Sequence, residues 1–262
     1  MQLLKNLNPP QQQAVKHAAG PLLVLAGAGS GKTRVIVHRI AWLIHEHGVR
    51  PWQILAVTFT NKAAGEMRER VEKLLGGVET PQISTFHATC VRILRREIGR
   101  LGFGSNFAIY DDKESERLLK EVIIEQNIDE KKYPAKAFAA AIDDCKNAGR
   151  SPHDLATGDQ MAERLFKVYS AYQLRLAKCN ALDFGDLLLY TVRLFEEFPE
   201  VLQQYREKWQ WLLVDEYQDT NPIQYRLIRL LAGERRNLCV VGDDDQSIYR
   251  WRGADIRNIL DF

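Results

Sequence analysis

Short apolar runs that alternate with helical patterns organise most of the chain. Five runs, at residues 22–25, 54–59, 82–85, 211–214 and 238–241, contain few polar positions, which is typical of strands buried on both faces of a parallel sheet. Helical periodicity follows three of them, over residues 33–47, 61–75 and 86–101, and each of these stretches meets glycine where it ends. Strand–helix alternation of this kind predicts an α/β, doubly wound domain with a parallel sheet of about five or more strands.

Between residues 110 and 182 the pattern changes to helical periodicity alone. Three stretches carry it, at 112–126, 134–148 and 160–178, and turn-forming residues separate them. We therefore predict an all-helical insertion at 110–182 in the α/β domain, which is expected to resume near Asp183.

The composition is that of an ordinary globular protein. Hydrophobic residues make up 45%, aromatic residues 9% and charged residues 27% of the 262, which excludes a disordered or fibrous chain. No apolar run approaches the ~20 residues that span a bilayer, and the N-terminus lacks the pattern of a secretion signal, so no membrane partner is expected. The four cysteines form no CxxC pair, which argues against a zinc site and favours a reduced, cytoplasmic location.

The charges are distributed unevenly along the sequence. The net charge of +2 combines +8 over residues 1–109, −1 over 110–182 and −5 over 183–262. A basic first part suggests a polyanionic partner, and an acidic last part suggests a metal ion. Charge alone does not distinguish this interpretation from a chance distribution over solvated faces.

A glycine-rich segment follows the first predicted strand and precedes a predicted helix. It consists of Ala26, Gly27, Ala28, Gly29, Ser30, Gly31, Lys32 and Thr33. Glycines allow backbone N–H groups to close around phosphate oxygens, and the helix N-terminus adds its positive end. Lys32 is predicted to reach the β- and γ-phosphates, and the Thr33 hydroxyl to bind Mg²⁺. Ala26 stands where the standard phosphate-binding pattern has glycine.

Acidic residues follow the two last predicted strands. Asp215 is placed to bind Mg²⁺ through water, and Glu216 to act as the base on an attacking water. After the last strand, three successive aspartates at 243–245 indicate, taken alone, an exposed loop. The neutral Gln246 beside them can donate and accept, which suits contact with a γ-phosphate or a water.

Aromatic rings stand near cations and hydroxyls where predicted strands end. The segments concerned are Phe59-Thr60-Asn61, Thr85-Phe86-His87 and Tyr249-Arg250-Trp251-Arg252. Such sets suit stacking on unpaired bases and contact with phosphates. A single ring at a strand end more often belongs to the core. Several at the carboxyl ends of parallel strands would share the edge where open α/β sheets bind ligands.

In combination, these motifs resemble those of the UvrD/Rep/PcrA-type superfamily 1 DNA helicases. The chain is similar to the N-terminal half of such a helicase, which comprises subdomains 1A and 1B. The matching segments are 7–11 (LNPPQ, the Q motif), 26–33 (AGAGSGKT, motif I with the same alanine), 58–64 (TFTNKAA, motif Ia), 84–94 (STFHATCVRIL), 182–188 (LDFGDLL), 213–221 (LVDEYQDTN, motif II) and 241–254 (VGDDDQSIYRWRGA, motif III). Their order and number make coincidence negligible, although each alone is weak.

The resemblance implies a RecA-like P-loop NTPase fold that uses ATP and Mg²⁺. It implies that Gln11 recognises adenine, that Arg34 packs beside it, and that Gln246 senses the γ-phosphate. It also implies contacts with single-stranded DNA by one set of residues, namely Phe59, Thr60, Asn61, Thr85, His87, Tyr249, Trp251 and Arg252.

The resemblance also divides the chain. Residues 1–109 and 183–262 would form the ATPase core (1A), and 110–182 the 1B-like insertion that approaches duplex DNA at single-strand/double-strand junctions. The family's second RecA-like domain would lie beyond this sequence, so we expect a truncated piece of a longer helicase that moves 3′-to-5′ and acts in DNA repair or replication.

Three function classes stay open at this point. The first is an ATP-driven DNA motor, the second is a P-loop ATPase switch that acts on a protein, and the third is an inert DNA-binding module. They differ in whether nucleotide hydrolysis occurs and whether DNA stimulates it.

Overall fold

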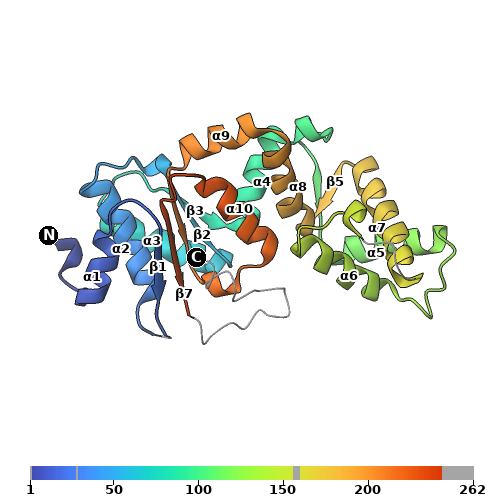
Figure 1. Ribbon diagram of the computed structural model, residues 1–262, viewed down its shortest axis with the longest axis horizontal. Helices are drawn as coiled ribbons and strands as arrows, with labels where there is room; N and C mark the ends of the chain where they lie inside the picture. Colours follow the sequence, from blue (N-terminus) through green and yellow to red (C-terminus); the bar gives the residue numbers. More distant parts are fainter. Residues whose placement is uncertain (1, 28, 156–159, 244–262) are drawn as a thin grey trace. The chain divides into compact units, whose positions relative to one another are not determined.

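The computed structural model describes residues 2–27, 29–155 and 160–243 (Figure 1). Contacts divide the chain into two compact units. The sheet unit comprises residues 1–89, 198–220 and 228–262, and the helical unit comprises 90–197 and 221–227. Two of the four divisions fall inside helices, α4 (Phe86–Glu97) and α10 (Pro222–Ala232).

The sheet unit contains a five-stranded parallel sheet. Its strands are β1 (Leu22–Leu25), β2 (Ile54–Thr58), β3 (Gln82–Thr85), β6 (Trp211–Val214) and β7 (Leu238–Gly242), in the order β1-β7-β6-β2-β3. Every neighbouring pair is parallel, with Leu25 opposite Gly242 and Val214 opposite Val240. The predicted α/β class and all five predicted strands are confirmed to within one residue at their ends.

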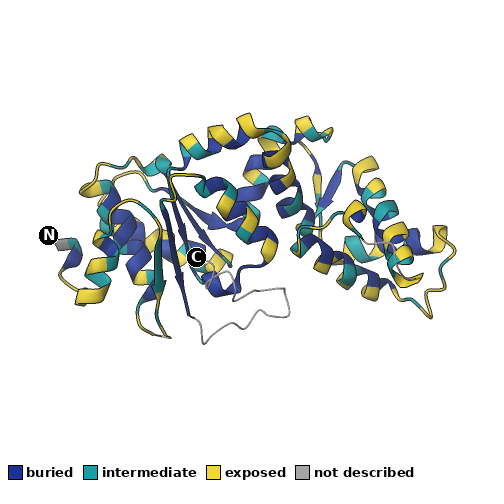
Figure 2. Ribbon diagram, in the orientation of Figure 1, coloured by how far each residue is buried: buried dark blue, intermediate teal, exposed yellow. Residues whose placement is uncertain are grey.

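Helices on one side of the sheet create its main core. They are α2 (Lys32–His45) and α3 (Asn61–Leu75). A smaller core forms where Val15 of α1 (Pro9–Lys16) packs with Val35 of α2. The helix α9 (Pro199–Lys208) and the short turns η1 (Gln2–Leu4), η2 (Pro51–Gln53) and η5 (Tyr217–Asp219) complete the unit. Figure 1 shows α2 and α3 together beside the sheet. Ile36, Ile40 and Met67 pack there against strand residues such as Leu213. The alternate strand positions, including Leu212 and Val214, are also buried, so both sheet faces are covered (Figure 2).

The helical unit is built on a separate core. Its helices are α5 (Asp112–Glu125), α6 (Ala135–Asn147), α7 (Gln160–Lys178) and α8 (Phe184–Glu197), with the turns η3 (Ile98–Leu101) and η4 (Pro152–Asp154). Phe138, Tyr169 and Tyr172 are almost fully buried between α5, α6 and α7. None of the helices in the described ranges of the chain combines the length and apolarity that crossing a bilayer requires.

The helical unit differs in one respect from the predicted all-helical insertion. It also contains a short parallel pair of strands, β4 (Ala108–Tyr110) and β5 (Ala181–Asp183). Three-residue strands give almost no periodicity, which is why the sequence pattern did not indicate them. The unit also extends on both sides of residues 110–182, so the predicted subdomain boundaries stay a prediction.

A buried ion cluster joins α6 to β5 and α8. The Lys146 ammonium donates to Asp183 at 2.6 Å and contacts Asp186 at 2.8 Å, and Lys146 and Asp186 are almost fully buried. Burial, followed by the charge of Asp183, raises the pKa of Asp186 to about 6. These contacts tie the segment after Asp183 to α6, and residues up to 197 belong to the helical unit by their contacts.

Replacing Lys146 should destabilise the helical unit in a pH-dependent way. Lys146→Met leaves two buried carboxylates without their cation, which costs about 3–5 kcal/mol. Folded carboxylates would then hold protons more tightly than unfolded ones, so the loss grows as the pH rises above about 4, the ordinary pKa of an aspartate. Unfolding is followed by circular dichroism, because the four tryptophans among the described residues lie in the sheet unit.

Lys120→Met is the matched control. Lys120 pairs with Glu116 on the exposed face of α5, and a surface pair of this kind is worth less than about 1 kcal/mol. Equal losses for the two variants would contradict a special role for the buried cluster.

Candidate functional site

The carboxyl ends of the five parallel strands meet at one edge of the sheet. β1 leads into the glycine-rich loop, β7 into Asp243, β6 into Asp215, β2 into Phe59, and β3 ends at Thr85. Neighbouring strands lie about 4.8 Å apart, so the loops that follow them lie within reach of one another. This edge therefore brings together the predicted nucleotide residues and the described part of the predicted DNA residues.

The glycine-rich loop adopts a backbone that requires glycine. Gly29 (φ +70°) and Gly31 (φ +87°) lie in the left-handed region, and α2 begins directly afterwards at Lys32. The N–H groups of the first helical turn lack intrahelical partners and can bind an anion. Ala28, predicted to be part of this loop, lies outside the described residues.

Gln11 supports the loop from α1. Its Nε2 donates to the Ser30 carbonyl at 2.9 Å, and its Oε1 accepts from the Asn8 N–H at 3.0 Å. A Cβ at Gly31 would lie 2.9 Å from Gln11 Nε2 and would displace the amide from this position. One N–H and one lone pair of the Gln11 amide remain for the predicted contact with adenine.

Arg34 projects from the first turns of α2 and is exposed. With His38, Arg70 and Lys73 it lines a cavity of about 350 Å³ beside α2 and α3. Its predicted packing beside adenine stays a prediction.

Lys32 points across the edge to β7. Its Nζ donates to the Ala26 carbonyl and to Asp243 Oδ2, both at 2.9 Å. The pair is buried, with 9% of the lysine side chain and 2% of the aspartate side chain exposed. The prediction of an exposed loop is wrong for Asp243: repulsion among aspartates favours solvent only while no cation is near, and Lys32 comes from a segment distant in sequence.

Thr33 and Asp215 meet where a magnesium ion is predicted. The Thr33 hydroxyl donates to Asp215 Oδ2 at 3.0 Å. Burial, followed by the negative charge of Glu216, raises the pKa of Asp215 to about 6, and a cation would offset both effects. Mg²⁺ is usually held by one or two protein groups together with phosphates and waters, which fits these two side chains. The described residues hold no cluster of three or more His, Cys, Asp and Glu that could bind a metal unaided.

Glu216 has a left-handed backbone conformation (φ +51°), which is unfavourable for a residue with a side chain. The turn directs its carboxylate toward Gln218, whose Nε2 donates to Glu216 Oε2 at 2.7 Å. The Gln218 Oε1 accepts from the Asp243 N–H at 3.0 Å. Gln218 is 2% exposed. It lies within the motif II match at 213–221, but no role was predicted for it.

The predicted DNA residues of the sheet unit occupy the ends of β2 and β3. Thr60 Oγ1 accepts from the Ala63 N–H and Thr85 Oγ1 from the Ala88 N–H, so the two threonines cap α3 and α4. Phe59 is half-buried, with its ring 5.5 Å from that of Phe86 in an edge-to-face arrangement. The remaining members have different degrees of exposure: Asn61 is exposed and His87 half-buried.

Four further predicted site residues lie outside the described part of the chain. They are Gln246, Tyr249, Trp251 and Arg252. Their roles stay predictions.

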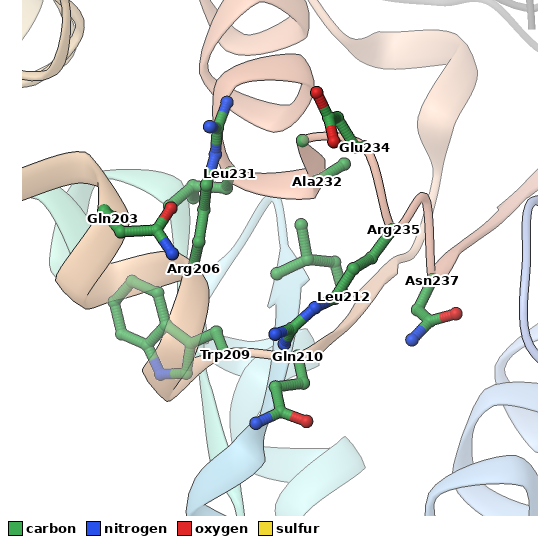
Figure 3. A pocket seen from close by; sticks show the side chains of 11 residues that line it. Gln203, Arg206, Trp209, Gln210, Leu212, Leu231, Ala232, Glu234, Arg235 and Asn237 are labelled. Atoms are coloured by element: carbon green, nitrogen blue, oxygen red, sulfur yellow. The ribbon is translucent and has the colours of Figure 1, made fainter. Parts of the chain in front are cut away.

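Another cavity, of about 280 Å³, lies at the opposite edge of the sheet, where β6 begins and just before β7 (Figure 3). Arg206 and Arg235 contribute to its wall from different segments. Arg206 Nε donates to the Leu230 carbonyl at 2.7 Å and so caps the end of α10. A Cβ at Gly233 would lie 2.9 Å from that nitrogen. The arginine thus has a structural role, and no predicted site residue lines this cavity.

The electrostatics of Asp215 give a stability test. Because its folded pKa lies above the ordinary value, the folded state holds the proton more tightly, and stability falls as the pH rises from about 4 to about 6. Asp215→Asn can keep both hydrogen bonds, with Nδ2 donating to Thr33 and Oδ1 accepting from the Glu216 N–H. We expect it to stabilise the chain by about 1–2 kcal/mol at neutral pH, and by nothing near pH 4, in urea unfolding.

Asp112→Asn, on the exposed start of α5, serves as the control and should change stability by less than about 0.5 kcal/mol. A lower stability of Asp215→Asn at neutral pH would show that the carboxylate charge is already compensated.

Comparison with known proteins agrees with this geometry. The UvrD/REP helicase N-terminal domain matches residues 7–262. The chain is 52% identical, over 99% of its length, to the ATP-dependent DNA helicase PcrA of Staphylococcus aureus (strain Mu50 / ATCC 700699), and 53% identical, over 100% of its length, to that of Bacillus subtilis (strain 168). It spans 36% of the length of each of these relatives. The chain therefore belongs to the UvrD/REP helicase family, of which it carries the N-terminal, RecA-like domain.

Proposed function

We propose that this chain is the ATP-binding and DNA-contacting part of an ATP-dependent DNA helicase. The observation that carries the proposal is the shared edge: Lys32 and Thr33 face Asp215 and Asp243 at the ends of β1, β6 and β7, and Phe59 follows β2 on the same edge. Two strand positions separate Asp215 from the end of β3, about 10 Å at the usual strand spacing. Nucleotide and nucleic acid would thus be held by one rigid sheet.

The nucleotide half of this edge supplies the elements of phosphoryl transfer. The N–H groups of the loop and of α2 would hold the phosphates, and Lys32 would offer its ammonium to the β- and γ-phosphate oxygens. Bound Mg²⁺ would neutralise the charge that develops on the phosphates. Thr33 and Asp215 are the residues that would hold it. Glu216 would accept a proton from the attacking water as the bond from the γ-phosphorus to ADP breaks.

The part of the edge at β2 and β3, proposed to bind nucleic acid, presents two helix N-termini and the Phe59 ring. Thr60 and Thr85 cap two helices whose positive ends point to the carboxyl edge, which favours contact with phosphates. The Phe59 ring is fixed by its contact with Phe86 and suits stacking on an unpaired base. His87, Asn61, Tyr249, Trp251 and Arg252 are proposed to complete this surface, and Gln246 to link it to the γ-phosphate.

The relatives are much longer than this chain, which spans 36% of their length, so the chain alone is expected to be less active than the whole protein. We infer that a second RecA-like domain of the whole protein supplies arginines to the γ-phosphate, as the family resemblance implies. Loss of such an arginine can cost ~10³-fold or more in phosphoryl transfer. The present chain should then bind nucleotide loosely, hydrolyse it slowly and unwind no duplex. The whole protein would move 3′-to-5′ on single strands in the cytoplasm, with the 1B-like residues 110–182 near duplex junctions, in DNA repair or replication.

An ATPase assay with and without single-stranded DNA tests this proposal. We expect slow hydrolysis that single strands stimulate, and stronger stimulation when the downstream domain is present. Hydrolysis indifferent to DNA would favour a switch that acts on a protein, and salt-sensitive DNA binding without any nucleotide effect would favour an inert binding module.

Lys32→Ala should abolish nucleotide binding, measured by calorimetry with Mg²⁺ and ATP. The substitution removes the buried ammonium that faces the phosphate site. Lys113→Ala, on the exposed first turn of α5, is the control and should bind like the unmodified chain. Unchanged affinity of Lys32→Ala would contradict the assignment of the phosphate loop.

Phe59→Ala should weaken binding of an oligo(dT) strand by about 1–3 kcal/mol, the usual value of one stacked base. Trp52→Ala is the matched control, because Trp52 is an exposed ring that precedes the opposite end of the same strand, β2. Fluorescence anisotropy measures both. Equal weakening would indicate that DNA does not bind at the carboxyl edge.

A further inference from the structure

A continuous chain of hydrogen bonds connects Glu216 to Lys32. Gln218 Nε2 donates to Glu216 Oε2 at 2.7 Å, the Asp243 N–H donates to Gln218 Oε1 at 3.0 Å, and Lys32 Nζ donates to Asp243 Oδ2 at 2.9 Å. These four residues lie in the segments that follow three neighbouring strands: Lys32 after β1, Asp243 after β7, and Glu216 and Gln218 after β6. We call them the relay.

The chemistry of the middle position requires a side chain that both donates and accepts, as an amide does. A carboxylate only accepts hydrogen bonds and a main-chain N–H only donates them, so the group between Glu216 and Asp243 must do both. Among side chains that also avoid a charge at this buried position, glutamine has the length that spans the gap. The 3₁₀ turn η5, which follows the left-handed Glu216, directs Gln218 back into it.

One end of the relay is the Lys32 ammonium, which a bound phosphate is expected to contact. An ammonium has three N–H donors, and Lys32 uses two of them on Ala26 and Asp243. An incoming β- or γ-phosphate would compete with the buried Asp243 carboxylate for this charge. Because the Asp243 main chain is hydrogen-bonded to Gln218, a displacement of Asp243 would be transmitted to the group that holds Glu216.

We propose that Gln218 is a positioning residue that orients Glu216 toward the attacking water, and that Asp243 is the counter-ion that phosphate displaces from Lys32. This inference rests on the proposed ATPase function. It adds that occupancy of the phosphate site controls the orientation of the Glu216 carboxylate. Gln218 and Asp243 transmit this effect and bind neither nucleotide nor DNA themselves.

Gln218→Met tests the first part, since methionine has a similar length but neither hydrogen-bonding group. We expect kcat for ATP hydrolysis to fall about 10- to 100-fold, within the range that a positioned base contributes. KM and the affinity for ADP should stay within about threefold, because no nucleotide contact is removed. Gln218→Glu keeps the acceptor for Asp243 but faces Glu216 with a like charge, and it should also lower kcat. Labelled ATP followed over hours makes slow turnover measurable.

Gln224→Met is the matched control for loss of a buried glutamine. Gln224 is 6% exposed and caps the start of α10 by accepting from the Asn221 N–H at 3.0 Å, in the helical unit. It should lower the melting temperature and leave kcat unchanged. Equal loss of kcat in Gln218→Met and Gln224→Met, or a rise in KM instead of a fall in kcat, would overturn the positioning role.

Asp243→Asn tests the second part through binding alone. With the negative charge removed, phosphate no longer displaces a carboxylate, and we expect ATP and ADP to bind about 5- to 20-fold more tightly in calorimetry with Mg²⁺. Unchanged or weaker binding would overturn the counter-ion role. If the unmodified chain itself binds no nucleotide, the proposed function fails; if it binds and hydrolyses ATP while the variants behave like it, only the relay fails.

Discussion

The parallel pairing of β1, β7 and β6 is the constraint on which the site depends. Leu25 lies opposite Gly242 and Val214 opposite Val240, so three loops leave the sheet at the same edge within two strand spacings. This register brings the Lys32 ammonium to Asp243 and the Thr33 hydroxyl to Asp215. A slip of one residue would reverse the faces of the strands and separate these side chains.

The edge is also electrostatically unbalanced, and this suits a protein that binds a metal–nucleotide complex. Asp215 and Glu216 are adjacent carboxylates, and burial makes the charge of the first costly. A cation and a polyphosphate together would satisfy both the acidic side and Lys32. The helical unit shows a contrasting case, in which the buried acids Asp183 and Asp186 already contact a cation of the chain itself, Lys146.

Much of this arrangement could be predicted from the sequence. The strands lie on apolar runs that periodicity detects, and the phosphate loop and the Asp215–Glu216 pair follow two of them directly. Three features could not be predicted. β4 and β5 are too short to give a periodic signal, and the pairing of Lys146 with Asp183 and Asp186 joins positions whose proximity only the fold creates. The relay residues Gln218 and Asp243 were missed because their meaning depends on contacts between strands far apart in sequence.

The most direct test of the account is a crystal structure of this chain with Mg²⁺ and a non-hydrolysable ATP analogue. We expect the triphosphate in the loop between β1 and α2, with Lys32 on the β- and γ-phosphates, Mg²⁺ between the phosphates and the side chains of Thr33 and Asp215, and Asp243 released from the ammonium. A nucleotide bound elsewhere, with the Lys32–Asp243 pair intact, would contradict it.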